Sequence, residues 1–168
     1  MIRHVAPGLV ALLLTAAPTQ AAQSCDALTA KMIRATGASL AGRTGAYAVF
    51  RAADAERMSL DCGSPRRMAF GSREREPIRP YFALIGLAAQ ALTGAEAEAV
   101  EVLALNLHQD SLLTGAAREG SVGRAALRCE TGPRADGLAG NLTICLLTPN
   151  RGQVLRRRAG LSAGPKAG

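Results

Sequence analysis

The sequence is poor in aromatic side chains. Only 3% of its 168 residues are aromatic, and it has no Trp. Aromatic rings supply the largest apolar surfaces in a protein core, so this core must gain stability in another way. Aromatic side chains are also the platforms on which unpaired bases stack, and their scarcity argues against nucleic acid as a partner.

The sequence also lacks the common motifs of cofactor and catalytic sites. It has no glycine-rich phosphate-binding loop and no Gly-x-Ser-x-Gly nucleophile motif. No Cys-x-x-Cys pair is present, which disfavours a zinc site or a thioredoxin-like site. Glu96, Glu98 and Glu101 have no histidine-containing partner motif, so we interpret them as a solvated first turn of a helix. We therefore expect no cofactor and no metal.

Histidine is scarce as well, and His108 is the only one after the first 21 residues. A Ser/His site would have to use it together with Asp110 and Ser111, its neighbours in sequence. All three fall at the end of a predicted helix, where a histidine cation suits the negative end of the helix dipole. We favour this helix-end role, and a small hydrolase that uses His108 is the alternative.

The first 21 residues have the pattern of an export signal. Arg3 provides a charged start, residues 5–17 form a short apolar core, and residues 19–21 resemble a cleavage site. This apolar core is shorter than the roughly 20 residues that span a bilayer, and no later segment is long and apolar enough. We expect a periplasmic or extracellular protein without a transmembrane segment once the signal is removed.

Four cysteines follow the signal, and an even number in an exported chain predicts two disulfides. Four cysteines allow three pairings, which the sequence does not distinguish. We prefer the two local pairs, each of which would stabilise the fold by roughly 3–4 kcal/mol through loop entropy. These are Cys25–Cys62 and Cys129–Cys145.

The chain is basic, with a formal net charge of +7. Residues 151–168 show no convincing core pattern and contain an unopposed basic run, so we predict a flexible basic tail there. Such a tail would suit anionic polymers or lipid head groups of a cell envelope. The run consists of Arg156, Arg157 and Arg158.

The stretch 77–113 has the densest apolar pattern after the signal. Apolar residues at helical spacing predict one helix over about 80–92 and a second over about 95–108. Gly94 is suited to end the first helix, and Thr93 with Glu96 fits a capping box that starts the second. Val102 and Leu105 fall outside the predicted inward stripe of the second helix, so we regard them as a possible partner surface.

Strand patterns lie on both sides of this helix pair. A helix is predicted over 24–36, followed by a hairpin of residues 45–52 and 58–62 and a short third strand at 68–70. Residues 122–130 and 141–147 should form a second hairpin that brings Cys129 and Cys145 together. A bridge between them places both on one face, so Leu142, Ile144 and Leu146 should lie on the opposite face, which would then also be covered.

These patterns predict a single α+β domain over residues 22–150. Its mostly antiparallel sheet of about four strands packs against the central helix pair, with an N-terminal helix and two disulfides. The absence of catalytic motifs favours an exported, non-enzymatic domain that binds a protein or an anionic envelope component. The alternatives are the hydrolase that uses His108 and a purely structural envelope protein.

Overall fold

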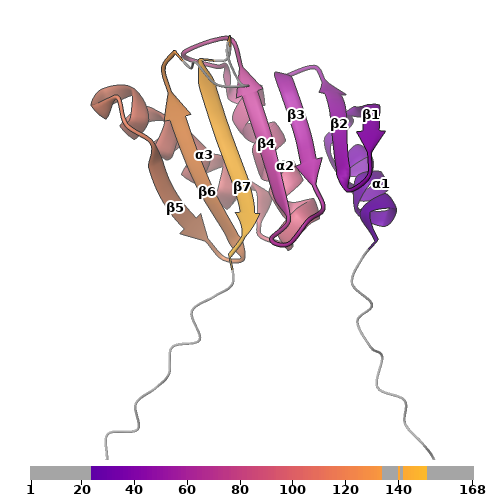
Figure 1. Ribbon diagram of the computed structural model, residues 1–168. Coiled ribbons are helices and arrows are strands. Elements are labelled where there is room, and N and C mark those ends of the chain that lie inside the picture. The colour runs from indigo at the N-terminus through magenta and orange to yellow at the C-terminus, as the bar shows by residue number, and fades with distance from the viewer. Residues whose placement is uncertain (1–23, 134–139, 141, 151–168) are drawn as a thin grey trace, which may run out of the picture.

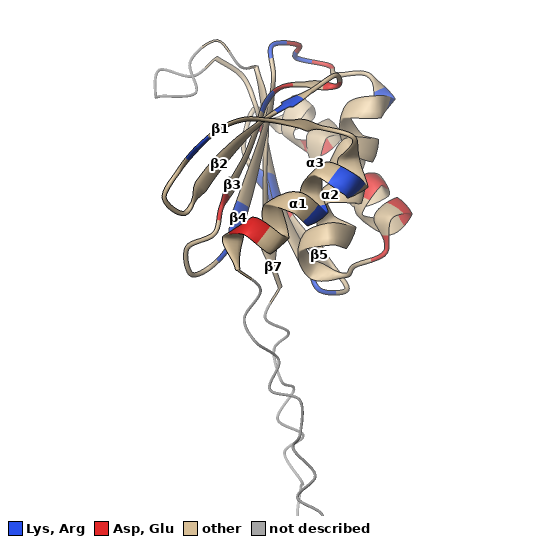
Figure 2. Cartoon of the chain, turned by 90° about the vertical axis from the view of Figure 1, so that its right-hand side faces the viewer, with Lys and Arg blue, Asp and Glu red and all other residues tan. Residues whose placement is uncertain are grey.

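The computed structural model describes residues 24–133, 140 and 142–150 (Figure 1). They form an α+β fold in two layers, with a seven-stranded antiparallel sheet and three helices on one of its faces (Figure 2). The predicted export signal, most of the loop between the last two strands and the predicted basic tail lie outside the described residues.

The sheet has the strand order β1-β2-β3-β4-β7-β6-β5. All neighbouring strands are antiparallel, and only β4 and β7 are neighbours that do not follow each other in sequence. The strands are β1 (Ser39–Thr44), β2 (Tyr47–Ala52), β3 (Ala55–Asp61), β4 (Arg67–Ser72), β5 (Arg118–Val122), β6 (Ala125–Thr131) and β7 (Thr143–Pro149).

The prediction of about four strands was therefore too low. Strands β1 and β5 were missed, and they are the two edges of the sheet. Apolar alternation identifies a strand only where one of its faces is buried, and neither edge strand has a buried residue. All six residues of β1 are exposed, and β5 alternates only between exposed and half-buried positions.

Helices α1 (Cys25–Thr36), α2 (Arg79–Thr93) and α3 (Ala97–Thr114) confirm the predicted helices. Gly94 ends α2 in the left-handed conformation, with a φ of 74°. The predicted capping box is wrong, because Glu96 itself is the N-cap of α3 and its carboxylate accepts from the backbone N–H of Glu98 and Ala99. The Thr93 hydroxyl instead donates to the carbonyl of Ala89 and accepts from the N–H of Ala95.

The two central helices approach each other closely at Gly86. A Cβ atom at this position would lie 2.4 Å from the carbonyl oxygen of Ala97, at the start of α3. Only glycine leaves room for this approach. The packing of α2 against α3 therefore depends on one missing side chain.

The core lies between the helices and the sheet. Large buried side chains of the sheet, among them Met58, Leu60, Met68 and Phe70, face Tyr81, Phe82 and Ile85 of α2. Both predicted disulfides are confirmed. Cys25–Cys62 joins the start of α1 to the end of β3, while Cys129 and Cys145 pair across β6 and β7 at a Cα–Cα distance of 4.2 Å. The second bridge is fully buried and belongs to the core.

The described part of the chain is nearly neutral. It carries 13 Lys and Arg side chains and 12 Asp and Glu side chains, a net charge of +1. Almost all of the formal charge of +7 therefore belongs to residues outside the described part. No helix in the described part is long and apolar enough to cross a membrane. The two disulfides fit an oxidising compartment, as expected of an exported protein.

Candidate functional site on the open face of the sheet

Among the described residues, the three helices lie on one face of the sheet, and no helix or strand covers the other face (Figure 2). The strand register brings alternate residues of neighbouring strands side by side on this open face, because side chains alternate between the two faces of a sheet. Tyr47 lies opposite Asp61, Ser59 opposite Ala69, and Asp61 opposite Arg67. Beyond β4 the row continues through Leu146, Arg128 and Glu119.

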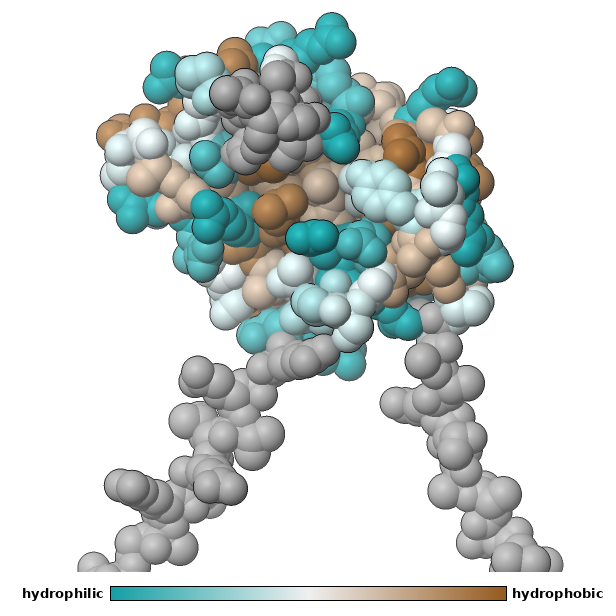
Figure 3. All heavy atoms as spheres, viewed as in Figure 1, coloured by the Kyte–Doolittle hydropathy of each residue, from teal (hydrophilic) through white to brown (hydrophobic). Residues whose placement is uncertain are grey.

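The middle of the open face is apolar and built from small side chains. Ala69 and Gly71 of β4 lie opposite Leu146 and Ile144 of β7. Ile144 is only 3% exposed, although it lies on the face away from the helices, and Leu142 and Leu146 are half-buried. This arrangement agrees with the face assignment that the Cys129–Cys145 bridge required. The expected cover over this face is wrong for the described residues, since their helices all lie on the other face. Figure 3 shows apolar side chains in the middle of this face, with hydrophilic ones around them.

One hollow on this face has a volume of about 300 Å³, and we call it the tyrosine pocket. Burial has the largest single influence on the pKa of Tyr47 and raises it, but the polar side chain of Ser59 and the cation of Arg57 together leave the pKa below its usual value. The pocket therefore holds a partly buried hydroxyl beside a cation. Its lining residues are Tyr47, Arg57, Ser59, Asp61, Arg67, Ala69 and Leu146.

Asp61 fixes the position of Arg67 in this pocket. The carboxylate accepts from the backbone N–H of Gly63 at 2.9 Å and from the Arg67 guanidinium at 3.1 Å. Both hydrogen bonds favour the ionised carboxyl, so the pKa of Asp61 lies below its usual value. At neutral pH the pocket thus contains one carboxylate and two guanidinium groups.

A second hollow of about 540 Å³ adjoins the tyrosine pocket and shares Arg67 and Leu146 with it. It extends over β6 and β5, where Arg128 binds Glu119 at 2.9 Å. Glu130 lies 3.8 Å from the same guanidinium. Together the two hollows form a depression across the open face with charged side chains of both signs.

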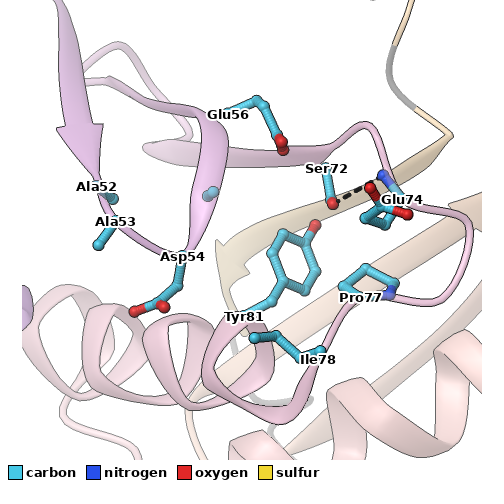
Figure 4. Close-up of a pocket in the computed structure, with 10 residues that line it drawn as sticks. Ala52, Ala53, Asp54, Glu56, Ser72, Glu74, Pro77, Ile78 and Tyr81 are labelled. Atoms are coloured by element: carbon cyan, nitrogen blue, oxygen red, sulfur yellow. Dashed lines mark hydrogen bonds between the residues drawn. The ribbon is translucent and has the colours of Figure 1, made fainter.

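A further hollow of about 540 Å³ lies at one end of the sheet, between the β2–β3 turn and the start of α2 (Figure 4). Asp54, Glu56 and Glu74 surround it, but some of the polar groups that line it form hydrogen bonds within the protein. Glu56 accepts from the backbone N–H of Arg73 at 3.0 Å. The Tyr81 hydroxyl donates to the carbonyl of Phe70 at 3.1 Å, and burial raises the pKa of this tyrosine.

His108 does not meet its expected companions in a catalytic arrangement. Its side chain is 4% exposed, and Nε2 donates to the carbonyl oxygen of Arg75 at 2.9 Å. The Ser111 hydroxyl instead pairs with the hydroxyl of Thr131 at 3.0 Å and accepts from the Thr131 backbone N–H, while Asp110 is exposed. The predicted helix end at residue 108 was also wrong, because α3 continues to Thr114. His108 therefore ties α3 to the loop before α2.

The predicted partner surface on α3 is sparse. Val102 is 52% exposed, but exposed polar residues Glu98, Asn106 and Gln109 surround it along the helix. Leu105 is half-buried and packs against the core. Arg156, Arg157 and Arg158 lie outside the described residues. A single exposed apolar residue is common on protein surfaces, so this part of α3 forms no apolar patch.

The acidic residues at the start of α3 have structural partners. Glu96 caps the helix, and Glu101 pairs with Arg79 of α2 at 2.7 Å. In the part of the chain that the structure describes, no group of three His, Cys, Asp or Glu side chains could hold a metal ion. The acidic cluster thus fits the interpretation as the first turn of a helix.

The tyrosine pocket was not predicted from the sequence. Its only signal was the alternation that put Ser59 and Asp61 on one face of β3, since Arg67 and Leu146 join them through sheet pairing. No family model, no curated protein and no solved structure matches this chain. The arguments about function therefore rest on the geometry of the open face.

Proposed function

We propose that this chain is an exported, non-enzymatic domain that binds a protein on the open face of its sheet. The observation that carries the proposal is the depression over β2, β3, β4, β7, β6 and β5, opposite the helices. An apolar middle with polar groups around it is the usual anatomy of a protein-binding surface. The central apolar residues are Ala69 and Leu146, which are half-buried, and Ile144, which is almost fully buried.

The charge of the open face favours a protein over an anionic polymer. Arg57, Arg67 and Arg128 are interspersed with Asp61, Glu119 and Glu130. A polyanion or an anionic bilayer would meet these carboxylates with repulsion, whereas a protein surface can present both signs of charge in a complementary pattern. An anionic envelope component is therefore the second outcome that the experiment must detect.

Neither of the other functions gains support from the described residues. The hydrolase would need His108 beside a nucleophile, but the His108 and Ser111 side chains bind different backbone segments, at Arg75 and Thr131. A purely structural role would not require a polar depression on the open face, although it does not contradict one. Binding is the function that accounts for this surface.

Two valines on opposite sides of the domain allow a matched test. Val49 lies on the open face and is 37% exposed, and Val102 lies on α3 and is 52% exposed. A photo-cross-linking amino acid would replace each valine in turn, in the full chain produced in its native compartment. We expect a discrete protein adduct from position 49 only. We also expect the identified partner, once purified, to bind the domain and to lose affinity when Arg67→Glu is introduced.

Three results would overturn this proposal. An adduct from position 102 alone would move the partner surface to the helices. If the component cross-linked at position 49 resists protease, the partner is an anionic envelope component and not a protein. Equal adducts from both positions, or no adduct from either, would contradict binding on the open face.

A further inference from the structure

The geometry points to a more specific role for the tyrosine pocket, which rests on the proposed function: it holds an Asp or Glu carboxylate of the protein partner. Two arginines approach the pocket from opposite ends. Arg57 is opposite Gly71 in the β3–β4 ladder, and Arg67 is opposite Asp61 four residue pairs further along. At about 3.3 Å per residue, their Cα atoms are roughly 13 Å apart along the strands.

Small side chains lie between these two arginines. Ser59 and Ala69 are the opposed pair midway along this part of the ladder, and both line the pocket. The long side chains of Arg57 and Arg67 can therefore reach into the same hollow from its two ends. A ligand group placed over Ser59 and Ala69 lies within reach of both guanidinium groups.

The existing partner of Arg67 leaves donors for a ligand. Asp61 accepts one hydrogen bond from the Arg67 guanidinium. A guanidinium group carries five N–H donors, so this contact leaves further donors on Arg67. The Tyr47 hydroxyl can donate its proton to an anion, and the pair with Asp61 holds the Arg67 guanidinium in place before the ligand arrives.

The charge and shape of the pocket favour a carboxylate. Two guanidinium groups and the Asp61 carboxylate give the lining a net charge of +1. A carboxylate balances that charge, and it is planar, so it can accept two parallel N–H bonds from one guanidinium. A phosphate dianion would exceed the charge and meet stronger repulsion from Asp61. Ala69 and Leu146 provide apolar contact for the methylene groups of an acidic side chain.

Single amino acids with blocked termini can probe the pocket without knowledge of the partner. N-acetyl-glutamate amide would be titrated into the full chain, and the Nε–Hε resonances of Arg57 and Arg67 would be followed by NMR. We expect saturable shifts of these resonances. N-acetyl-glutamine amide should give no such shifts, and inorganic phosphate should bind several times more weakly than the glutamate probe.

A pair of variants tests the site. Arg57→Gln should weaken binding of the glutamate probe about tenfold, because it removes a charged donor of the pocket. Arg34→Gln is the matched control, since Arg34 is an exposed arginine of α1, on the helix side of the sheet, and does not line the pocket. That control should leave the affinity for the probe unchanged.

The outcomes separate this inference from the proposed function. Equal binding of the glutamine probe, tighter binding of phosphate, or an equal effect of the two variants would overturn the carboxylate assignment. If position 49 still cross-links to a protein whose binding ignores Arg57→Gln, the proposed function stands and this inference fails. If the probe binds as expected but position 49 gives no adduct, the proposed function fails instead.

Discussion

The two faces of the sheet differ although they are built from the same strands. On β3 and β4 the side chains that face the helices, such as Met58, Leu60 and Phe70, are buried in the core. The residues between them, such as Ser59, Asp61 and Ala69, line the open-face pocket. Alternate residues of one segment thus face the core and the proposed binding pocket. Substitutions of neighbouring residues should therefore have separate effects.

The largest effect is expected at Phe70, which is fully buried on the covered face. Phe70→Ala should lower the free energy of unfolding by about 3–5 kcal/mol, because it removes a buried ring and leaves a cavity. Urea unfolding measures this loss. The neighbouring Ala69→Ser, on the open face, is the control and should change the free energy by less than about 0.5 kcal/mol. Similar losses for both variants would contradict the separation of the two faces.

The buried disulfide should contribute somewhat less. Replacement of Cys129 and Cys145 by Ala should lower the free energy of unfolding by about 3 kcal/mol, from the entropy of the loop that the bridge closes. The bridge spans 16 residues of sequence. Denaturant unfolding of the double variant would show this loss, and a change below about 1 kcal/mol would show that β6 and β7 hold together without the bridge.

A smaller effect is expected where the helices meet above the covered face. Gly86→Ala should cost about 2 kcal/mol, because the new Cβ would displace the carbonyl of Ala97. Gly42→Ala in the exposed edge strand β1 is the matched control, since nothing lies within 4 Å of its Cβ position. Thermal unfolding compares the two variants. A loss no greater for Gly86→Ala than for Gly42→Ala would show that the helix pair can move apart freely.

The smallest effect concerns the ion pair of the open face. The pKa of Asp61 is lowered in the folded state, so its stabilising contribution is present above the pKa of the unfolded chain, near 3.9, and is lost as the pH falls through the folded value. Wild type should exceed Asp61→Asn in unfolding free energy by less than about 1 kcal/mol at pH 7, because the pair is partly exposed. Urea unfolding at decreasing pH should show the two curves converge in acid, and a constant difference would contradict this origin.

The sequence predicted the features that depend on local pattern. Helical spacing and Gly94 identified α2, the alternation in β3 separated Met58 and Leu60 from Ser59 and Asp61, and the locality of the cysteine pairs gave the disulfides. The edge strands β1 and β5 escaped because neither has a fully buried residue, so neither shows the apolar alternation that identifies a strand. The end of α3 was misplaced because His108 and Ser111, although polar, are buried and their partners lie in distant segments.

The tyrosine pocket could not be predicted for a related reason. Its residues come from β2, β3, β4 and β7, and Leu146 joins them only through the pairing of β4 with β7. That pairing leaves no local pattern in either strand. The sequence can assign a residue to one face of a strand, but it does not show which strand will lie beside it.

The pairing of β4 with β7 also affects how the sheet forms in time. Every other pair of neighbouring strands is consecutive in the chain, so β1–β4 and β5–β7 can each form by adding one hairpin at a time. The two halves join only at β4 and β7, through contacts that are distant in sequence and therefore slow to form. While the chain is being synthesised, β4 keeps an unpaired edge until residues 143–149 are available. During that interval the edge can pair with another chain, so the last strand both completes the fold and closes a route to aggregation.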